Sequence, residues 1–479
     1  MSSLKDNTDW LLSEFQSLDL EDPRLIDRFF ITAQLLASKP SDCIHKACGK
    51  WSAVKGAYRL FSNDKVSIED IFTCHQQETV KRTADHELVF AIQDTTFLDY
   101  HKHKKTEGLG TISRPYGDKH KRGLIAHLTF AVTQQALPLG VLTWKCWSRV
   151  ARPTRTRYEV QLGNIERETK DKESSKWIDA LRETHELLKS HNTKIVTLAD
   201  RESDSYELMH EHIKNGRSFV IRSRVNRRLD KSRRSKPKMH EVINLQDPCG
   251  YYEIDVPAKP GKKARKAKLS IRYMKVTTPL RGNIKGGISK NREGLPATID
   301  FNFILAFEEN PPSEEERIEW RLMTNEVVSS FNEAVEKVSW YKLRWNIETF
   351  FRTLKSGCQI EATRLNEAKK LEKYNVLMSI IAWRICSMTH LSRINSNDPC
   401  TRFLSEDQWK VLYCRTKRTN KLPKKPPTCK EATIWIAQLG GFLNRKCDGL
   451  PGPMSLWRGW QALEEMTPLY LIMAPALAP

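Results

Sequence analysis

One stretch constrains the fold of this chain more than any other. It runs from Ser339 to Gly357 and reads SWYKLRWNIETFFRTLKSG. No Pro or Gly interrupts it before Gly357, which stands where the C-terminal stop of a helix belongs. The pattern therefore predicts one continuous helix, and at about 3.6 residues per turn its apolar residues fall on one side. This apolar stripe consists of Trp340, Leu343, Ile347, Phe351 and Leu354.

A polar face lies beside the stripe. Tyr341, Arg344, Glu348 and Lys355 stand at −7, −4, 0 and +7 around Glu348, and these spacings share one helical face. One carboxylate flanked by cations suits a metal ion that lies next to phosphate oxygens. The same spacing also fits an ordinary Arg–Glu pair on a solvated surface. Both interpretations stay open on spacing alone.

Composition indicates the class of partner. The chain has 479 residues and a net charge of +21, which allows several domains and predicts a polyanionic partner, most often nucleic acid. A basic membrane-surface protein is the alternative, but the sequence has no long amphipathic basic helix and no lipidation signal. It also lacks a run of about 18 apolar residues and an apolar N-terminal signal region. Eleven cysteines without a CxxC pair predict free thiols. We therefore expect a cytoplasmic protein.

Residues 1–68 predict a small helical DNA-binding domain. Apolar residues recur at helical spacing over 10–18, 24–36 and 55–61. Asp22 followed by Pro23 reads as a helix cap with Pro at the first helical position. The cationic side of this unit carries Arg24, Arg28, Lys46, Lys50, Lys55 and Arg59. A solvated basic face is the alternative interpretation.

From Glu87 onward the pattern changes to strands. The sequence predicts strands over 88–92, 125–132, 139–147, 194–199 and 218–222, with a helix over 171–191. Three strands in a meander, then a helix and two more strands, predict an α/β fold with a mixed sheet.

Two aspartates follow strands of this sheet, Asp94 after the first and Asp200 after KIVTLA. If these strands are neighbours, the two carboxylates lie side by side at the sheet edge where ligands bind in α/β folds. Glu348 comes from a helix packed across the sheet. Three clustered carboxylates repel each other unless cations neutralise them, and they are hard oxygen ligands for Mg²⁺ or Mn²⁺. A strand-end Asp that merely caps a turn is the alternative for each aspartate.

A basic segment interrupts the α/β plan over 223–320. It is strand-like, with nine Lys or Arg against one acid in 222–238 and eight against none in 259–275. We interpret it as a β-rich insertion that faces nucleic acid, although 228–238 also fits a disordered basic loop. A long apolar helix over 365–392 and a basic linker over 415–430 follow. Residues 431–479 are helical again.

Three segments resemble the signature regions of the DDE transposases. They are AIQDTTFLDY at 91–100, ADRESDSYEL at 199–208 and YKLRWNIETFFRTLKSG at 341–357. The Tyr-(2)-Arg-(3)-Glu-(6)-Lys spacing is matched within the third. The chain is similar to the cut-and-paste transposases of bacterial insertion sequences, of the transposon-five type. The likeness covers nearly the whole chain and weakens after Trp460.

The resemblance implies a ribonuclease-H-like mixed sheet with helices, a β-rich insertion, and helical N- and C-terminal domains. The expected boundaries are 1–68 for DNA binding, 69–375 for catalysis with the insertion at about 223–320, and 376–479 for dimerisation. It also implies a cytoplasmic, nucleoid-associated bacterial enzyme.

The resemblance further implies roles for individual residues. Asp94, Asp200 and Glu348 would hold two Mg²⁺ ions, for which Mn²⁺ can substitute. Tyr341, Arg344 and Lys355 would grip phosphates at the cleaved end, and Trp320 would stack a flipped base unless it is core packing. The expected further contacts to end DNA are Arg222, Arg364, Arg24, Arg28 and Arg59.

The implied activity is that of a homodimer bound to double-stranded transposon ends. It would hydrolyse one strand, form a hairpin with the freed 3′-OH, reopen it and join the end to target DNA. Two alternatives remain at this point. One is a plain metal-dependent nuclease, and the other is a catalytically inactive regulator that occupies the ends.

Overall fold

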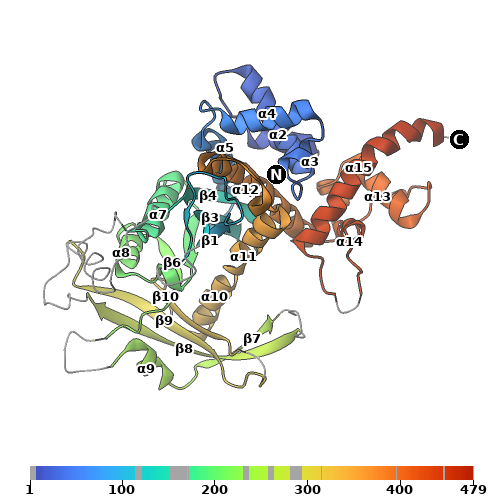
Figure 1. Ribbon diagram of the computed structural model, residues 1–479. Helices are drawn as coiled ribbons and strands as arrows, with labels where there is room; N and C mark the ends of the chain where they lie inside the picture. The colour runs from blue at the N-terminus through green and yellow to red at the C-terminus, as the bar shows by residue number, and fades with distance from the viewer. Residues whose placement is uncertain are drawn as a thin grey trace.

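The computed structural model describes most of the chain. The described residues are 7–113, 121–149, 170, 172–229, 237–256, 264–280, 294–313, 316–394, 396–445 and 448–477. A mixed ten-stranded sheet lies at the centre, with helices on both of its faces (Figure 1). Its strand order is β2-β3-β1-β5-β6-β10-β9-β8-β7, and β4 pairs with β3. The predicted α/β class with a mixed sheet is therefore confirmed.

The first half of the sheet holds the five predicted strands and one short strand, β2, that was not predicted. Their bounds are β1 Leu88–Asp99, β2 Gly110–Thr111, β3 Arg122–Thr133, β4 Pro138–Trp147, β5 Lys194–Ala199 and β6 Ser218–Arg222. β5 lies parallel to both β1 and β6, and β3 lies antiparallel to β1. The expectation that Asp94 follows the end of its strand is wrong, because β1 continues to Asp99 by pairing with β3.

The basic insertion extends this sheet. Its strands are β7 Gly250–Val256, β8 Arg265–Pro279, β9 Thr298–Glu308 and β10 Glu319–Thr324, and α9 spans Met239–Asn244. β10 pairs antiparallel with β6, with Leu322 opposite Arg222. The insertion is thus β-rich, as predicted, and it continues the central sheet (Figure 1). Part of its predicted basic face, 230–236 and 257–263, lies outside the described residues.

The N-terminal region is helical, as predicted. It contains α1 Asn7–Glu14, α2 Pro23–Ser38, α3 Ile44–Cys48, α4 Trp51–Ser62 and α5 Ile68–Ala84. The carboxylate of Asp22 accepts a hydrogen bond from the Arg24 amide at 2.9 Å, with Pro23 at the start of α2. This is the cap that the sequence indicated.

The predicted single helix over 339–357 is interrupted. The structure has α10 Phe331–Lys342, α11 Trp345–Arg352 and a π-helical segment Thr353–Gly357. At the break, the Leu343 and Arg344 amides bond to the carbonyls of Trp340 and Tyr341, each at 3.0 Å. These i to i−3 bonds tighten the turn as in a 3₁₀ helix. The prediction of one continuous helix is wrong, because a change of hydrogen-bond spacing needs no Pro or Gly.

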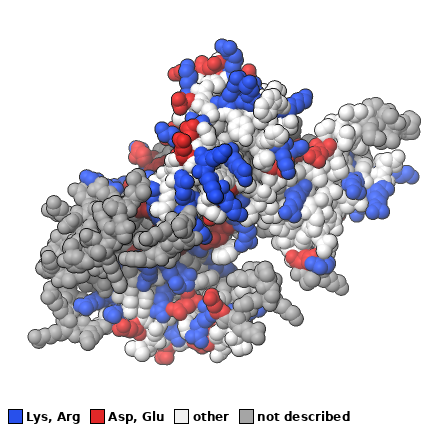
Figure 2. Space-filling model, viewed as in Figure 1, with Lys and Arg blue, Asp and Glu red and all other residues white. Residues whose placement is uncertain are grey.

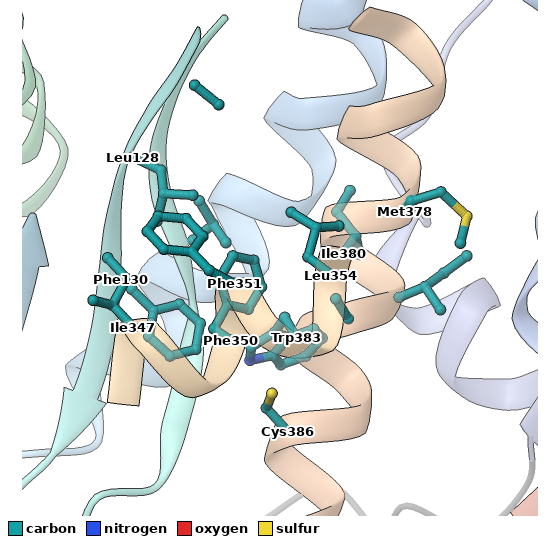
Figure 3. Packing of buried hydrophobic residues seen from close by; sticks show 14 of the residues in the cluster. Leu128, Phe130, Ile347, Phe350, Phe351, Leu354, Met378, Ile380, Trp383 and Cys386 are labelled. Carbon is teal, nitrogen blue, oxygen red and sulfur yellow. The ribbon is translucent and has the colours of Figure 1, made fainter. Parts of the chain in front are cut away.

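α11 is fixed by apolar packing on its buried side. Ile347, Phe350 and Phe351 lie between β3 and α12 Ala368–Ile394 (Figure 3). The rings of Phe130 and Phe350 have centroids 4.7 Å apart. Truncating such a buried Phe to Ala typically costs about 3–5 kcal/mol. The packing therefore holds α11 in one position against the sheet, and Glu348 is held with it.

The remaining helices cover the other sheet face and form the C-terminal region. α7 Ser175–Leu188 and α8 Tyr206–Lys214 pack on the opposite face of the sheet from α11 (Figure 1). The C-terminal helices are α13 Glu406–Lys417, α14 Cys429–Leu439 and α15 Pro453–Leu477, around a cluster of their own. In the described ranges, no helix is both long and apolar enough to cross a membrane. Every cysteine within these ranges is a free thiol.

Candidate active site

Asp94 and Asp200 lie next to each other at one edge of the sheet. The parallel ladder between β1 and β5 ends at the pair Gln93 and Ala199, and each aspartate is the next residue in its chain segment. Asp200 begins a 3₁₀ turn by accepting a hydrogen bond from the Glu202 amide at 2.8 Å. Asp94 and Asp200 thus directly follow the last pair of this parallel ladder, in the region where α/β sheets bind ligands, although β1 itself continues to Asp99.

Arg344 joins the first strand to α11. Its guanidinium donates to the Asp94 carboxylate at 3.1 Å and to the Glu348 carboxylate at 3.3 Å. The side chains of Asp94 and Arg344 are each only 14 % exposed, whereas that of Glu348 is 39 % exposed. Three side chains from two distant parts of the chain therefore meet in one partly buried cluster.

The charges of this cluster show how close the carboxylates are. The pKa of Asp94 is raised to about 7: burial is the largest cause, the charge of Arg344 lowers the pKa, and the charges of Asp200 and Glu348 raise it. The charges of Asp200 and Glu348 both act on Asp94, and Arg344 contacts Asp94 and Glu348. Even so, no three Asp, Glu, His or Cys side chains of the described segments converge closely enough to hold a metal ion. The cation within the cluster is the guanidinium of Arg344.

The donor set of this cluster fits a divalent metal ion. Its members are carboxylate oxygens, which are the ligands that Mg²⁺ and Mn²⁺ prefer. The like charges of Asp94, Asp200 and Glu348 repel one another, so a nearby cation is favourable. In this structure that cation is the guanidinium of Arg344.

An aromatic and cationic rim adjoins the carboxylates. Tyr341 is buried, and Arg344 and Arg222 both lie near its phenol. Burial raises the pKa of Tyr341, while these two guanidinium groups oppose the shift. The ring of Trp320 lies edge-on to that of Tyr341, with centroids 5.9 Å apart. Arg222 also donates to the Glu319 carbonyl at 2.8 Å. Trp320 is half-buried here and packs partly against the core.

Other predicted residues lie farther from the carboxylates. Lys355 is in the π-helical segment, where it donates to the Phe97 carbonyl and pairs with Glu361 at 3.8 Å. Arg364 is exposed near His103, whose pKa is lowered by burial and by the charge of Arg364. Neither cation touches the Asp94 cluster in the contacts that the structure describes.

The three N-terminal arginines belong to a separate helical unit. Arg24 and Arg28 are one turn apart on α2, and Arg59 is on α4. Arg28 lies so close to Gly56 of α4 that an added Cβ would come within 2.5 Å of its guanidinium. An alanine at position 56 would therefore displace the flexible, partly exposed side chain of Arg28.

Two further residues were missed by the sequence reasoning. Trp51, at the start of α4, is 71 % exposed between Lys50 and Lys55, and its place between two lysines was a signal. Asp204 is buried, pairs with Arg227 and accepts hydrogen bonds from two backbone amides of the segment that leads into the insertion. Its position four residues after Asp200 gave no signal of its own.

Positive charge covers much of the surface. On the face in Figure 2, Lys and Arg side chains gather over the N-terminal helices and across the middle of the molecule. Such a surface attracts the phosphates of nucleic acid.

Comparison with known proteins found three matching families along the chain. The family described as transposase DNA-binding matches residues 7–66, the transposase DDE domain matches 169–384, and the transposase Tn5 dimerisation domain matches 380–467. The DDE match includes Asp200 and Glu348, and Asp94 lies ahead of it.

Proposed function

Since the chain belongs to the DDE transposases and is related to the Tn5 transposase, we propose that it excises a transposon through a hairpin intermediate and joins it to target DNA. It has a DNA-binding domain, a DDE domain and a dimerisation domain. In this proposal, a homodimer pairs two double-stranded ends. Because its substrate is DNA, the enzyme acts in the bacterial cytoplasm at the nucleoid.

One observation carries the proposal. Asp94 and Asp200 directly follow the last pair of the β1–β5 ladder, and Arg344 connects Asp94 to Glu348 of α11 through hydrogen bonds of 3.1 and 3.3 Å. A cluster of like charges is costly unless a cation serves it. Asp94, Asp200 and Glu348 would together hold divalent metal, Mg²⁺ or Mn²⁺, in one or two ions. When bound, the metal activates the attacking oxygen and stabilises the leaving oxygen of a phosphoryl transfer.

The remaining residues of the cluster would position DNA. Arg344 and Arg222 offer guanidinium groups that bind phosphate oxygens in pairs. Tyr341 lies near both arginines and its ring contacts that of Trp320, so the strand would pass from the carboxylates toward the indole. Lys355 and Arg364 would contact more distant phosphates. The N-terminal arginines Arg24, Arg28 and Arg59 would bind the end sequence.

Every proposed step exchanges one phosphodiester bond for another bond to phosphorus. Water attacks first and releases a 3′-OH. That hydroxyl attacks the opposite strand, which forms the hairpin and frees the flanking DNA. Water reopens the hairpin, and the same 3′-OH then attacks target DNA. No covalent intermediate with the enzyme is needed, so one set of carboxylates can serve all steps.

The role of Trp320 distinguishes a transposase that forms a hairpin from a plain nuclease. Hairpin formation requires a base to leave the duplex, and an aromatic partner restores about 1–3 kcal/mol of stacking. We expect Trp320→Ala to nick labelled end DNA near normally but to form hairpins about ten- to a hundredfold more slowly. Trp320→Phe, which keeps an aromatic ring, should retain most of the hairpin rate.

The measurement is a time course on denaturing gels that resolve nicked from hairpin product. An abasic site at the flipped position should partly rescue Trp320→Ala. Equal loss of both products would return Trp320 to a packing role. Nicked product alone from the unmodified enzyme would favour the plain nuclease, and no product at all would favour an inactive end-binding regulator.

A further inference from the structure

The position of Arg344 in this DNA-free structure has a consequence for metal binding. Its two terminal nitrogens each contact a different carboxylate, Asp94 at 3.1 Å and Glu348 at 3.3 Å. The guanidinium therefore occupies the space between two of the three oxygen donors that the proposed function assigns to metal.

Two other cations near the cluster are engaged elsewhere. Arg222 donates to the Glu319 carbonyl, and Lys355 donates to the Phe97 carbonyl and pairs with Glu361. Of the described side chains, Arg344 is the one that donates hydrogen bonds to both Asp94 and Glu348. A weakly hydrated, planar guanidinium suits such a partly buried position better than an ammonium does.

We propose that Arg344 is a removable internal cation: it keeps Asp94 and Glu348 from binding divalent metal until DNA phosphates draw it away. This inference rests on the proposed function and adds an order of events to it. End DNA binds first, Arg344 turns to a phosphate, and the two carboxylates become free. The unbound enzyme is thereby kept from hydrolysing DNA at random.

The local structure permits this movement. Arg344 lies in the turn between α10 and α11, outside the regular hydrogen bonding of either helix. Its side chain can therefore change rotamer without breaking a helix. A phosphate offers the guanidinium the same pair of hydrogen bonds that the two carboxylates provide. Because coupling between two ligands is reciprocal, metal should also tighten the binding of end DNA.

The test measures Mn²⁺ binding by the full-length, DNA-free protein, with free Mn²⁺ followed by electron paramagnetic resonance. We expect Arg344→Gln to bind Mn²⁺ at least tenfold more tightly than the unmodified protein. Arg344→Lys should lie between them, since one ammonium cannot bridge both carboxylates as the guanidinium does. Arg352→Gln is the matched control: it removes one positive charge from an exposed position of α11 without freeing a carboxylate, and should change affinity less than twofold.

A second substitution in the Arg344→Gln protein tests whether the gain in Mn²⁺ affinity depends on Asp94. Adding Asp94→Asn should abolish the tighter Mn²⁺ binding, and adding end DNA to the unmodified protein should raise its Mn²⁺ affinity toward that of Arg344→Gln. Thermal unfolding checks that each variant is folded. Equal Mn²⁺ affinity of the folded Arg344→Gln and unmodified proteins overturns the inference.

The two proposals fail in different ways. If Asp94→Asn and Asp200→Asn abolish end cleavage but Arg344→Gln gains no Mn²⁺ affinity, the internal-cation role is wrong and the proposed function stands. If those two substitutions leave both cleavage and Mn²⁺ binding unchanged, the carboxylates are not the metal site and both proposals fall.

Discussion

At the scale of single residues, the free-energy cost of the site falls mainly on the ionised carboxylate of Asp94. It is largely buried, and two like charges lie near it, so its ionised form is disfavoured in the folded protein. Arg344 offsets only part of this cost. Carboxyl groups with a strongly raised pKa and charged partners are common at functional sites.

Because the ionised form of Asp94 is disfavoured in the fold, the free energy of unfolding should depend on pH. This dependence can be measured without metal. The pKa of Asp94 is about 7 in the fold and 3.8 ordinarily, so between these values the folded state binds more protons than the unfolded state. The free energy of unfolding should therefore fall as the pH rises through this range, and the penalty is complete above about 7. We expect Asp94→Asn to remove a loss on the order of 1–4 kcal/mol.

The measurement is urea unfolding at pH 5 and pH 8 in the presence of EDTA. Glu372, whose pKa is also raised to about 7 by burial, titrates in both proteins, so the difference between them isolates Asp94. An unchanged pH dependence in Asp94→Asn would mean that the ionised carboxylate is not disfavoured by the fold.

Most residues of the cluster could be identified from the sequence, but the contact between Arg344 and Asp94 could not. Asp200 was placed correctly because a short apolar strand ends immediately before it. Spacing suggested that Arg344 and Glu348 share a face, and the structure has them in contact. The contact between Arg344 and Asp94 joins residues 250 positions apart, and no local pattern reports such a contact.

At the scale of elements, a buried ionic cluster ties the N-terminal unit to the catalytic core. Glu14, in the last turn of α1, accepts two hydrogen bonds from Arg82 of α5, each at 2.9 Å. It also contacts Nδ1 of His75, whose Nε2 accepts a hydrogen bond from the Val141 amide of β4. Since Nε2 is an acceptor, the proton is on Nδ1 and is donated to Glu14.

Removing the Glu14 carboxylate should weaken the attachment of α1 to α5. Burial alone would raise the pKa of Glu14, but Arg82 and His75 lower it to about 2. Glu14→Ala leaves Arg82 without its buried partner, and we expect a loss of about 3–5 kcal/mol in urea unfolding at pH 7. The contribution should be present above the ordinary value of 4.5 and disappear as the pH falls toward 2.

Glu253→Ala is the control for an exposed ion pair. Glu253 of β7 pairs with Lys266 of β8 at 3.9 Å, their side chains are 63 % and 73 % exposed, and such pairs contribute less than about 1 kcal/mol. Similar losses in the two variants would show that the Glu14 cluster is no stronger than a surface pair.

The bounds of the strands and helices show which elements could be predicted from the sequence and which could not. β5 and β6 were predicted with their observed bounds, because short apolar runs are flanked by turn signals. β1 was ended too early, because Gln93, Asp94 and Thr95 are polar; they remain in the strand since β3 pairs with them. The break before α11 has no Pro or Gly to mark it.

At the scale of the whole molecule, one sheet connects the edge that carries Asp94 and Asp200 with the basic insertion. β6 carries Arg222 and pairs with β10, which carries Trp320, and β9 and β8 continue the sheet outward. DNA held by the outer strands would therefore be presented to the carboxylates by a continuous scaffold. Sequence reasoning found the insertion but could not join it to the sheet, because that pairing links residues about a hundred positions apart.

The outer strands should contribute to the salt dependence of DNA binding. Lys266, Lys268 and Lys275 of β8 are exposed. Each phosphate contact adds about 0.9 to the slope of log affinity against log salt. Replacing all three by Gln should therefore flatten the slope by up to about 3 units, whereas replacing all three by Arg should preserve it. The check is a series of gel shifts on end DNA from low to high salt, and an unchanged slope would mean that β8 does not touch DNA.

The most direct test of the account is end cleavage by Asp200→Ala in Mg²⁺, measured alongside DNA binding on the same preparation. The account assigns catalysis to carboxylates and binding to Lys and Arg contacts with phosphate. It therefore predicts that Asp200→Ala shifts end DNA at nearly the same protein concentration as the unmodified enzyme but yields neither nicked nor hairpin product. Cleavage at the unmodified rate by Asp200→Ala would contradict the account, because the chemistry would then not depend on this cluster of carboxylates.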